Sequence, residues 1–531
     1  MTIVQPLTPE YEDYLHDESR SVGCADFIAF PQSEQEVREV LRELYPSGNA
    51  ITLQGTRTGL AAGAVPDGGY IVNLSRMNKF LGMRVDENGC FFLRVQPGVM
   101  LLELRQALRG RSIPSEGRDA ASRAALQTFL DAPLQTFPVD PTESSASLGG
   151  IAACNASGAK SYRYGAVRKH ISALRMVLSD GDVLDVYRGE IYARNRSLTL
   201  HTEDGRTIEA HLPSYDMPQA KCASGYFVAD NMDAIDVIIG SDGTLGAITE
   251  LELVLMPSPD SVWDTSCFLP SERAALDFVE RTRATVTHAS SIEYIDAAAI
   301  DILRRRQQQG GGAADLPTPP DGEVYCVAVE IACDNDDEAM ADLELLMEAL
   351  EAAGGDADAT WVASTEAERE EQRAFRHAVP ESVNHVIDER KRSYPTITKL
   401  GSDMSVPPAR LCDAVALYRR TLAREGLQSA TWGHIGDAHL HVNILPRNDE
   451  DYLRGKALFS EWARDISAMG GAVSAEHGVG KLKRDFLATM YGEAALKEMA
   501  HFKLAFDPKG QLGRGNFFDA SLLDEQQDKM R

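Results

Sequence analysis

The sequence predicts an α+β fold, and two observations support this. From residue 51 to about residue 257, short β-type runs alternate with glycine-rich loops and few long helices. Beyond that point, longer helical patterns mix with buried strands. The composition, with 44% hydrophobic and 25% charged residues, is typical of a folded globular protein. A chain of 531 residues has room for about two to four domains.

The first elements follow from hydrophobic spacing. Val37, Val40, Leu41 and Leu44 recur at i, i+3, i+4 and i+7, which predicts an amphipathic helix over residues 34–45. The next run, residues 51–55, reads as a buried strand that enters a glycine-rich turn. Residues 112–146 are rich in Ser, Ala, Pro and Asp, and this composition predicts an inserted surface loop. Further β-type runs occupy residues 68–74, 91–98, 173–187 and 246–257.

A domain boundary is expected at residues 256–260, because proline and polar residues there continue neither periodic pattern. Residues 324–331 then form a buried strand, and a helix over 336–353 ends before Gly354. This helix is expected to bury one face, which consists of Met340, Leu343, Leu346, Met347 and Leu350. The division is therefore 1–256, 257–505 and a C-terminal segment, 506–531.

Charge and cysteine content exclude several classes of protein. The formal charge of −27 and the lack of a Lys/Arg-rich run argue against nucleic-acid binding. The eight cysteines are scattered without a C-x-x-C pair, as expected for reduced thiols in a cytoplasmic protein. The first 20 residues resemble no secretion signal, and no stretch of 18 apolar residues occurs. We therefore expect a cytoplasmic location; a peripheral contact with the inner membrane stays open.

A glycine-rich loop over residues 54–63 is the first functional signal. The chain has no G-x-G-x-x-G between a strand and a helix and no phosphate-binding P-loop. The loop instead offers backbone N–H groups freed by Gly55, Gly59 and Gly63, together with the hydroxyls of Thr56 and Thr58. This combination suits a pyrophosphate. An ordinary tight turn is the alternative for this loop taken alone.

A histidine-rich segment is the second signal. If residues 439–445 form a strand, its period of two places His439, His441 and Asn443 on one face, and the preceding loop delivers His434. Downstream, Glu476 and His477 lie in another glycine-rich turn. Two imidazoles and one carboxylate could form an open site for Zn²⁺ or Mn²⁺. A histidine that is merely hydrogen-bonded in a core is the alternative for any one of these side chains.

The glycine-rich segments resemble a known family when taken together. Residues 54–63, 137–141, 147–158, 164–165 and 240–249, in this order, are similar to the FAD-binding domain of the vanillyl-alcohol oxidase / p-cresol methylhydroxylase (PCMH-type) superfamily. The resemblance implies that these loops bind FAD. Because the first loop has neither His nor Cys and only Cys154 lies nearby, non-covalent FAD is expected. The implied cofactor-binding residues are Gly55, Thr56, Arg57, Thr58, Gly59, Leu60, Pro138, Asp140, Ser147, Gly149, Gly150, Asn155, Gly158, Gly243, Ile248 and Thr249.

The C-terminal motifs resemble those of FAD-linked D-2-hydroxyacid dehydrogenases, of the D-lactate, D-2-hydroxyglutarate and glycolate types. This resemblance implies a FAD-linked oxidase C-terminal α+β domain that binds substrate and metal. Its ligands would be His434, His441 and Glu476. It also implies that the segment 506–531 returns toward the FAD domain. The family commonly has Asn where this chain has His439. The implied catalytic residues are His477 as the base, Asn443 beside the substrate, and Arg376 and Lys399 as cations for a carboxylate.

The function that follows from the resemblance is oxidation of a D-2-hydroxy acid to the 2-oxo acid, with metal assistance and hydride transfer from C2 to flavin N5. The expected partners are a small anionic substrate and an electron acceptor, either a quinone, a cytochrome or an electron-transfer flavoprotein; a homodimer stays open. Three alternatives remain. They are a metal-dependent hydrolase or lyase with structural glycine loops, a flavoprotein subunit that relays electrons, and an oxidase that uses O₂.

Overall fold

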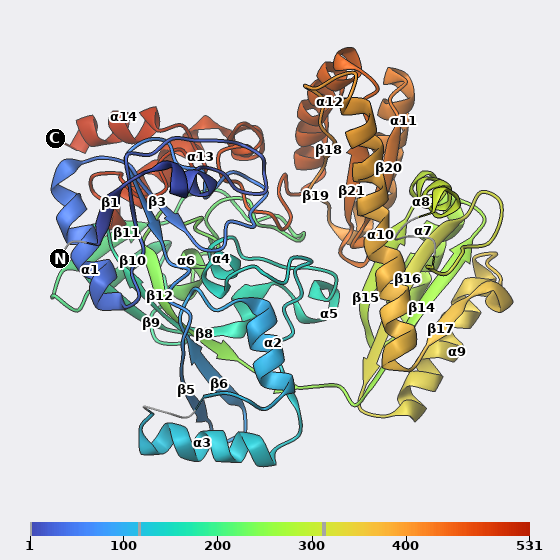
Figure 1. The fold of residues 1–531 in the computed structure, drawn as a ribbon, viewed down its shortest axis with the longest axis horizontal. Coiled ribbons are helices and arrows are strands. Elements are labelled where there is room, and N and C mark those ends of the chain that lie inside the picture. Colours follow the sequence, from blue (N-terminus) through green and yellow to red (C-terminus); the bar gives the residue numbers. More distant parts are fainter. Residues whose placement is uncertain (1–2, 115–117, 311–314, 531) are drawn as a thin grey trace.

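The chain folds into two lobes that lie side by side (Figure 1). The structure is a computed structural model that describes residues 3–114, 118–310 and 315–530. The first lobe runs to β13 (Met256–Pro257), and the second begins at β14 (Ser261–Leu269). After α12 (Asp449–Ala468) the chain returns to the first lobe. The two lobes are therefore connected at more than one point along the sequence.

A small sheet with strand order β1-β2-β4-β3 begins the first lobe. The predicted helix is α1 (Glu34–Leu44), which starts where the Ser33 side chain accepts a hydrogen bond from the Glu36 amide. Its predicted apolar face is buried against β3 and β4. The strands are β1 (Val4–Pro6), β2 (Phe27–Ala29), β3 (Ile51–Gln54) and β4 (Tyr70–Asn73).

A five-stranded antiparallel sheet, in the order β5-β6-β12-β8-β9, forms the base of the first lobe. The β-type runs after residue 68 are confirmed as strands here and in the small sheet. The strands are β5 (Phe80–Val85), β6 (Phe91–Val95), β8 (Ile171–Val177), β9 (Val183–Tyr187) and β12 (Ala247–Val254). Two short pairs, β10 (Ser197–His201) with β11 (Thr207–His211) and β7 (Gln135–Thr136) with β13, lie beside it.

The helices of this lobe are short, and one of them replaces an expected loop. Within residues 112–146, where the composition predicts a surface loop, Asp119 caps a helix that buries Phe129; residues 115–117 lie outside the described part of the chain. The loop prediction is wrong because alanines in that segment support a helix that packs on β5. The helices are α2 (Leu101–Arg109), α3 (Ala120–Asp131), α4 (Leu148–Ala153), α5 (Ser161–Tyr164) and α6 (Ile235–Ile238).

The second lobe is an antiparallel sheet in the order β17-β14-β16-β15-β20-β21-β18, with β19 paired to β21. Helices cover both faces: α7, α9, α11 and α12 share one apolar cluster, and α8 and α10 share another. The remaining strands are β15 (Ala289–Ile295), β16 (Tyr325–Cys333), β17 (Trp361–Ala363), β18 (Leu400–Gly401), β19 (Met404–Ser405), β20 (Ser429–Gly433) and β21 (His439–Ile444). The helices are α7 (Glu272–Thr285), α8 (Ala297–Gln309), α9 (Asp336–Ala352), α10 (Glu366–Lys391) and α11 (Leu411–Glu425).

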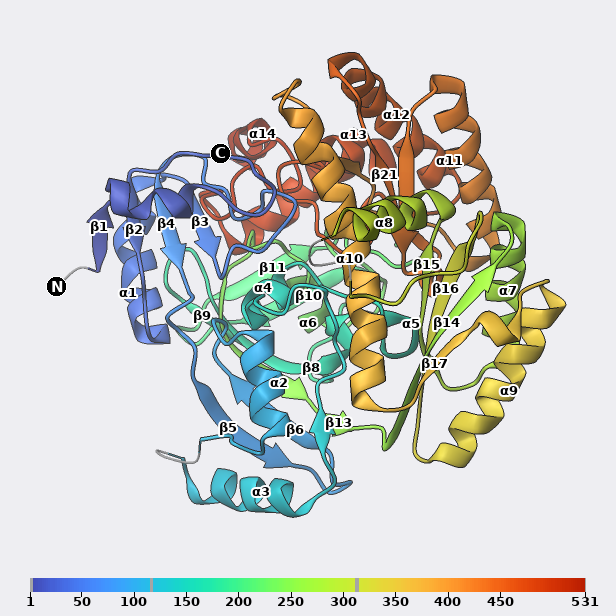
Figure 2. The same ribbon diagram turned by 45° about the vertical axis from the view of Figure 1, so that its right-hand side comes forward.

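The C-terminal part of the chain joins the first lobe. Helix α13 (Arg484–Phe506) buries Met499 and Phe502 in the main apolar cluster of that lobe, and Leu512 forms a bridge with Ile51. Helix α14 (Ser521–Met530) ends beside the N-terminal strands in both ribbon views (Figure 2). The division at residue 505 stays a prediction, but the core of the first lobe already includes α13.

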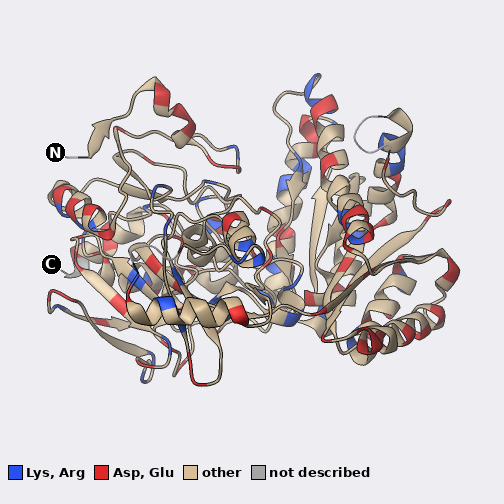
Figure 3. Ribbon diagram, turned by 60° about the horizontal axis from the view of Figure 1, so that its bottom comes forward, with Lys and Arg blue, Asp and Glu red and all other residues tan. Residues whose placement is uncertain are grey.

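Charged side chains are distributed over both lobes. On the ribbon in Figure 3, Asp and Glu residues occur in both lobes, with Lys and Arg residues interspersed among them.

Among the described residues, no helix is both long enough and apolar enough to cross a membrane.

Candidate functional site

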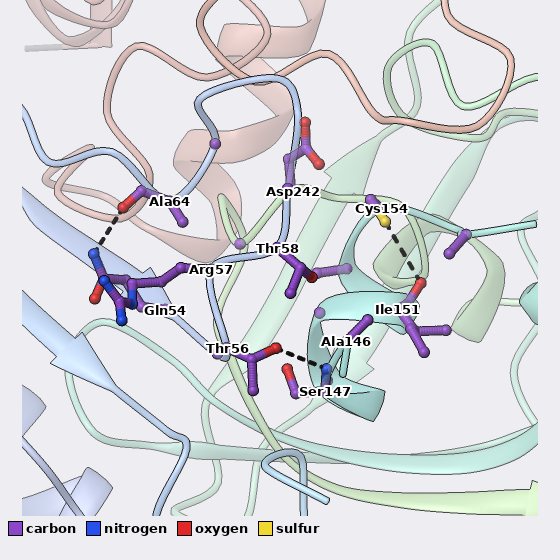
Figure 4. Close-up of a pocket in the computed structure, with 18 of the residues that line it drawn as sticks. Gln54, Thr56, Arg57, Thr58, Ala64, Ala146, Ser147, Ile151, Cys154 and Asp242 are labelled. Carbon is purple, nitrogen blue, oxygen red and sulfur yellow. Dashed lines mark hydrogen bonds between the residues drawn. The ribbon is translucent and has the colours of Figure 1, made fainter. Parts of the chain in front are cut away.

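Three of the predicted segments, residues 54–63, 147–158 and 240–249, meet around one cavity (Figure 4); Pro141 of the segment 137–141 also lines it, whereas Tyr164 and Gly165 do not. The loop after β3 runs along one side, and the Thr56 hydroxyl accepts a hydrogen bond of 3.0 Å from the Ser147 amide. That contact ties the first loop to the start of α4. The predicted residues that line the cavity are Gly55, Thr56, Arg57, Thr58, Gly59, Leu60, Ser147, Gly149, Gly150, Gly243 and Ile248.

Close backbone packing explains why glycine is needed in this cavity wall. A Cβ atom at Gly149 would lie 2.5 Å from the Pro97 Cβ, and one at Gly480 would lie 2.1 Å from the Ala61 carbonyl oxygen. Neither neighbour is the end of a flexible side chain. The wall therefore consists largely of backbone and small side chains, which suits a dinucleotide that is bound through backbone N–H groups.

Five predicted cofactor residues, including Gly158 and Pro138, lie outside the cavity lining. Asp140 forms an ion pair with Arg105. The Asn155 side chain accepts a hydrogen bond from the Arg168 amide and donates one to the Cys222 carbonyl oxygen. The Thr249 hydroxyl donates to Glu34 of α1, on the other side of the sheet. These polar side chains bind other parts of the protein and thereby stabilise the loops. A direct contact between these residues and the cofactor stays a prediction.

Cys154 lines the cavity, and its thiol donates to the Ile151 carbonyl (Figure 4). Burial, with the nearby Asp242 carboxylate, raises the pKa of this thiol to about 12. Because the thiolate is the nucleophile, such a thiol is poorly suited to a covalent bond with flavin.

Glu476 and His477 line the same cavity, and they belong to the histidine-rich cluster. His434 Nε2 lies 3.3 Å and His441 Nε2 lies 3.2 Å from the Glu476 carboxylate. His434 directly follows β20, as the predicted loop residue, and His441 lies within β21, where the predicted alternation places it on the same face as His439. The structure thus brings the predicted metal-binding side chains together at the edge of the flavin cavity.

The outer nitrogens of these two imidazoles have fixed partners. His434 Nδ1 lies 2.8 Å from Glu293, and His441 Nδ1 lies 3.0 Å from the Ser402 carbonyl oxygen. Such partners orient an imidazole so that its second nitrogen faces a cation. Burial lowers the pKa of His434, but Glu293 and Glu476 outweigh it and raise this pKa to about 10. The donor set of imidazoles and carboxylate fits a divalent transition metal.

His439 is fully buried beside this cluster. Its ring centroid lies 4.5 Å from that of His441, and its Nε2 lies 3.1 Å from Asp403. Burial, followed by the neighbouring His441, lowers the pKa of His439 to about 3. The side chain is therefore a neutral imidazole.

Asp403 holds the turn that carries Glu476 and His477. Its carboxylate accepts hydrogen bonds from both of their backbone amides and from Lys483. His477 Nδ1 lies 3.4 Å from the same carboxylate, and its ring is stacked on His441 at 5.5 Å. Burial alone would raise the pKa of Asp403, but His477 and Lys483 hold it well below the usual range.

Lys221 contributes a charge from the first lobe. Its ammonium lies 2.8 Å from Glu476 and donates to the Gly158 carbonyl oxygen. Burial raises the pKa of Glu476, but Lys221 and His434 outweigh this effect and hold it well below its usual range. Lys221 thereby connects the carboxylate of the cluster to the end of the α4 loop.

The predicted substrate cations have separate surroundings. Arg376 on α10 pairs with Asp264 of β14 at 3.9 Å. The Lys399 ammonium lies 5.3 Å from the centre of the Trp432 ring. Trp432 on β20 is the residue directly opposite His441 on β21. Burial, with a contribution from Arg20, lowers the pKa of Lys399 to about 8. Asn443 is buried on β21 and donates to the His441 carbonyl oxygen. Direct roles for these three residues stay predictions.

Sequence reasoning missed the partners that hold the cluster, namely Lys221, Glu293, Asp403 and Lys483. Asp403 stands only four positions after the predicted residue Lys399, so a search of that segment for acidic side chains could have found it. Glu293 lies 141 positions from His434 and Lys221 lies 255 positions from Glu476, and neither stands in a recognisable motif.

Comparisons with known proteins agree with this arrangement. The family model described as FAD binding domain matches residues 25–123 and 119–187, and the model described as FAD linked oxidases, C-terminal domain, matches residues 260–517. D-lactate dehydrogenase of Anaerostipes hadrus is 27% identical over 95% of this chain and 92% of its own length. D-2-hydroxyglutarate dehydrogenase of Rattus norvegicus is 26% identical over 92% of this chain and 77% of its own length.

A solved structure shares the fold. p-Cresol methylhydroxylase superimposes with a TM-score of 0.65 at 14% identity, over 98% of this chain and 94% of its own. The predicted α+β architecture, a PCMH-type FAD-binding domain followed by a FAD-linked oxidase C-terminal domain, is thus confirmed. The chain therefore belongs to the FAD-linked oxidases and is an FAD-dependent oxidoreductase.

Proposed function

We propose that this protein oxidises a small D-2-hydroxy acid to the corresponding 2-oxo acid. The observation that carries the proposal is that Glu476 and His477, which belong to the histidine-rich cluster, line the cavity formed by the flavin-binding loops. A substrate bound at the cluster would therefore meet the flavin. The names of the relatives, D-lactate and D-2-hydroxyglutarate dehydrogenase, support the substrate class.

Both bound groups would supply chemistry that side chains lack. The cavity-lining loops, with Thr56, Ser147 and Gly149, would hold FAD non-covalently, and its N5 would supply an acceptor for the hydride of the substrate's C2. A divalent cation, Zn²⁺ or Mn²⁺, on His434, His441 and Glu476 would polarise the hydroxyl and lower its pKa.

His477 is the base in this proposal. Its ring faces the cavity and lies against His441, so it can take the hydroxyl proton of a substrate bound at the cluster. The Asp403 carboxylate, 3.4 Å from Nδ1, would stabilise the imidazolium that forms. Asp403 also fixes the backbone of the turn, so the base and the ligand Glu476 keep their spacing.

The substrate carboxylate requires cations, because a formal charge of −27 repels anions from the protein as a whole. Arg376 and Lys399 are proposed for this role, with Asn443 beside the substrate. Arginine offers a bidentate fork, whereas lysine acts as a point charge. The electron acceptor, a quinone, a cytochrome or an electron-transfer flavoprotein, belongs to the same proposal, as do a cytoplasmic location and a peripheral membrane contact.

Anaerobic reduction of the flavin by a panel of D- and L-2-hydroxy acids tests the proposal. Purified protein should be yellow, and a D-2-hydroxy acid should bleach its absorbance, with metal analysis done on the same sample. A colourless protein would favour a metal-dependent hydrolase, and reduction only by a partner protein would favour an electron relay. Stoichiometric hydrogen peroxide in air would identify an oxidase.

A further inference from the structure

His439 does not have the surroundings of an ordinary core histidine. Its side chain is 0% exposed, and neither ring nitrogen has a hydrogen-bond partner among the described residues. Nε2 approaches Asp403 to 3.1 Å without being aligned for a hydrogen bond. Because a buried polar group without a partner is costly, the structure leaves a demand for a ligand at this position.

Each of three imidazoles has one ring nitrogen near the Glu476 carboxylate and the other near an oxygen outside the cluster. His434 and His441 each turn Nδ1 toward an outer acceptor and Nε2 toward Glu476. His439 has the reverse arrangement, with Nε2 toward Asp403 and Nδ1 at 3.9 Å from Glu476. In all three rings one nitrogen faces an outer oxygen and the other faces the carboxylate.

The spacing fits coordination of one ion. Metal–ligand bonds of about 2.1 Å in a tetrahedron place neighbouring donor atoms about 3.4 Å apart. His434 Nε2 and His439 Nδ1 lie 3.3 and 3.9 Å from Glu476 Oε2, and His441 Nε2 lies 3.2 Å from the other oxygen, Oε1. One donor atom from each of the four side chains lies within 4.8 Å of all the others.

We propose that His439 is a third imidazole ligand, so that the cation is bound by His434, His439, His441 and Glu476. This deepens the proposed function and rests on its metal-binding part. Three imidazoles and one carboxylate favour a late divalent transition metal such as Zn²⁺. Mn²⁺ and Mg²⁺ are disfavoured, because they prefer oxygen ligands. A substrate oxygen would then enter as a fifth ligand, a coordination that zinc accepts.

The experiment measures metal affinity and counts ligands on the full-length, FAD-containing protein. Dissociation constants for Zn²⁺ and for Mn²⁺ are obtained by chelator competition for the wild type and for His439→Asn. X-ray absorption of the Zn²⁺-loaded protein counts bound imidazoles. His288→Asn is the matched control, because His288 also lies beside a carboxylate of the second lobe, at 2.9 Å from Asp342, but outside the cluster.

The X-ray absorption spectrum should show three zinc-bound imidazoles in the wild type and two in His439→Asn. His439→Asn should weaken Zn²⁺ binding by more than the roughly 10- to 100-fold that loss of an outer partner costs. Mn²⁺ binding should change less, and His288→Asn should match the wild type. The count on wild-type protein is decisive even if the variant folds poorly.

Two outcomes overturn the inference, and they differ in what else they affect. Two imidazoles in the wild type, with unchanged Zn²⁺ affinity in the variant, would leave the proposed function intact and make His439 a neighbour of the site only. A wild type that binds neither cation would overturn the inference together with the metal-binding part of the proposed function, while FAD-dependent oxidation could still be measured separately.

Discussion

The flavin cavity and the histidine-rich cluster of His434, His439, His441, Glu476 and His477 are adjacent, but they are built by different means. The cavity wall is mostly backbone, glycine and small side chains, and its shape depends on close contacts such as Gly149 against Pro97. The cluster consists of ionisable side chains, and further charged or carbonyl groups hold most of them. Steric changes should therefore affect the first region most, and changes of charge or of ligand should affect the second.

The largest effect is expected from the base. His477→Ala should lower turnover by about 10²–10⁴-fold, the usual contribution of a general base, because His477 is the imidazole of the cluster that lines the cavity and is not one of the proposed metal ligands. FAD content should not change, since the imidazole is not part of the backbone cradle. Single-turnover flavin reduction under anaerobic conditions measures this, and a near-normal rate would reassign the base.

Loss of a metal ligand should come next. His441→Ala should reduce bound metal and turnover together while the protein stays yellow. Loss of a cation worth several kcal/mol corresponds to roughly 10²–10³-fold in rate. Metal analysis and flavin absorbance are measured on the same preparation. Full activity after complete metal removal would show that the cluster acts without a cation, and the comparison between the two regions would fail.

A pair of glycine variants sharpens the steric side of the comparison. A Cβ at Gly149, in the cavity wall, would lie 2.5 Å from the Pro97 Cβ, whereas one at Gly82, on β5 and outside the cavity lining, meets no atom closer than the Ser122 Oγ, at 3.4 Å. Overpacking costs about 1–3 kcal/mol, and at Gly149 it displaces the wall against which FAD binds, so Gly149→Ala should weaken FAD binding by roughly tenfold. Gly82→Ala should bind FAD normally. Equal FAD affinities in a titration would contradict the steric account.

The smallest effect is a pH dependence at Lys399. Its ammonium is present below a pKa of about 8 and is lost above it. If this charge binds the substrate carboxylate, kcat/KM should fall about tenfold between pH 7 and pH 9. Lys399→Arg should abolish that decrease, because arginine stays charged. A pH profile with the same decrease in both proteins would remove Lys399 from substrate binding.

Local patterns in the sequence predicted most of the elements and the side chains that gather in the histidine-rich cluster. The period of two over residues 439–445 correctly placed His439 and His441 on one face, because alternation is a property of the strand itself. The spacing of apolar residues in α1 likewise predicted its buried face, because that spacing follows from the period of the helix itself. In α9 the expected face was partly wrong: Met340 is 52% exposed, and Ala339, Asp342 and Ala349 are buried with Leu346 and Leu350.

The sequence by itself determined the family, the flavin-binding loops and the set of imidazoles near Glu476, since each is encoded in a short run of residues. Only the tertiary structure decided which groups orient them. Glu293, Asp403 and Lys221 reach the cluster from a central strand, a loop and the first lobe. The physical reason is that such contacts depend on which strands and loops of the second lobe lie side by side and, for Lys221, on how the two lobes pack; contacts between residues far apart leave no periodic signal in the chain.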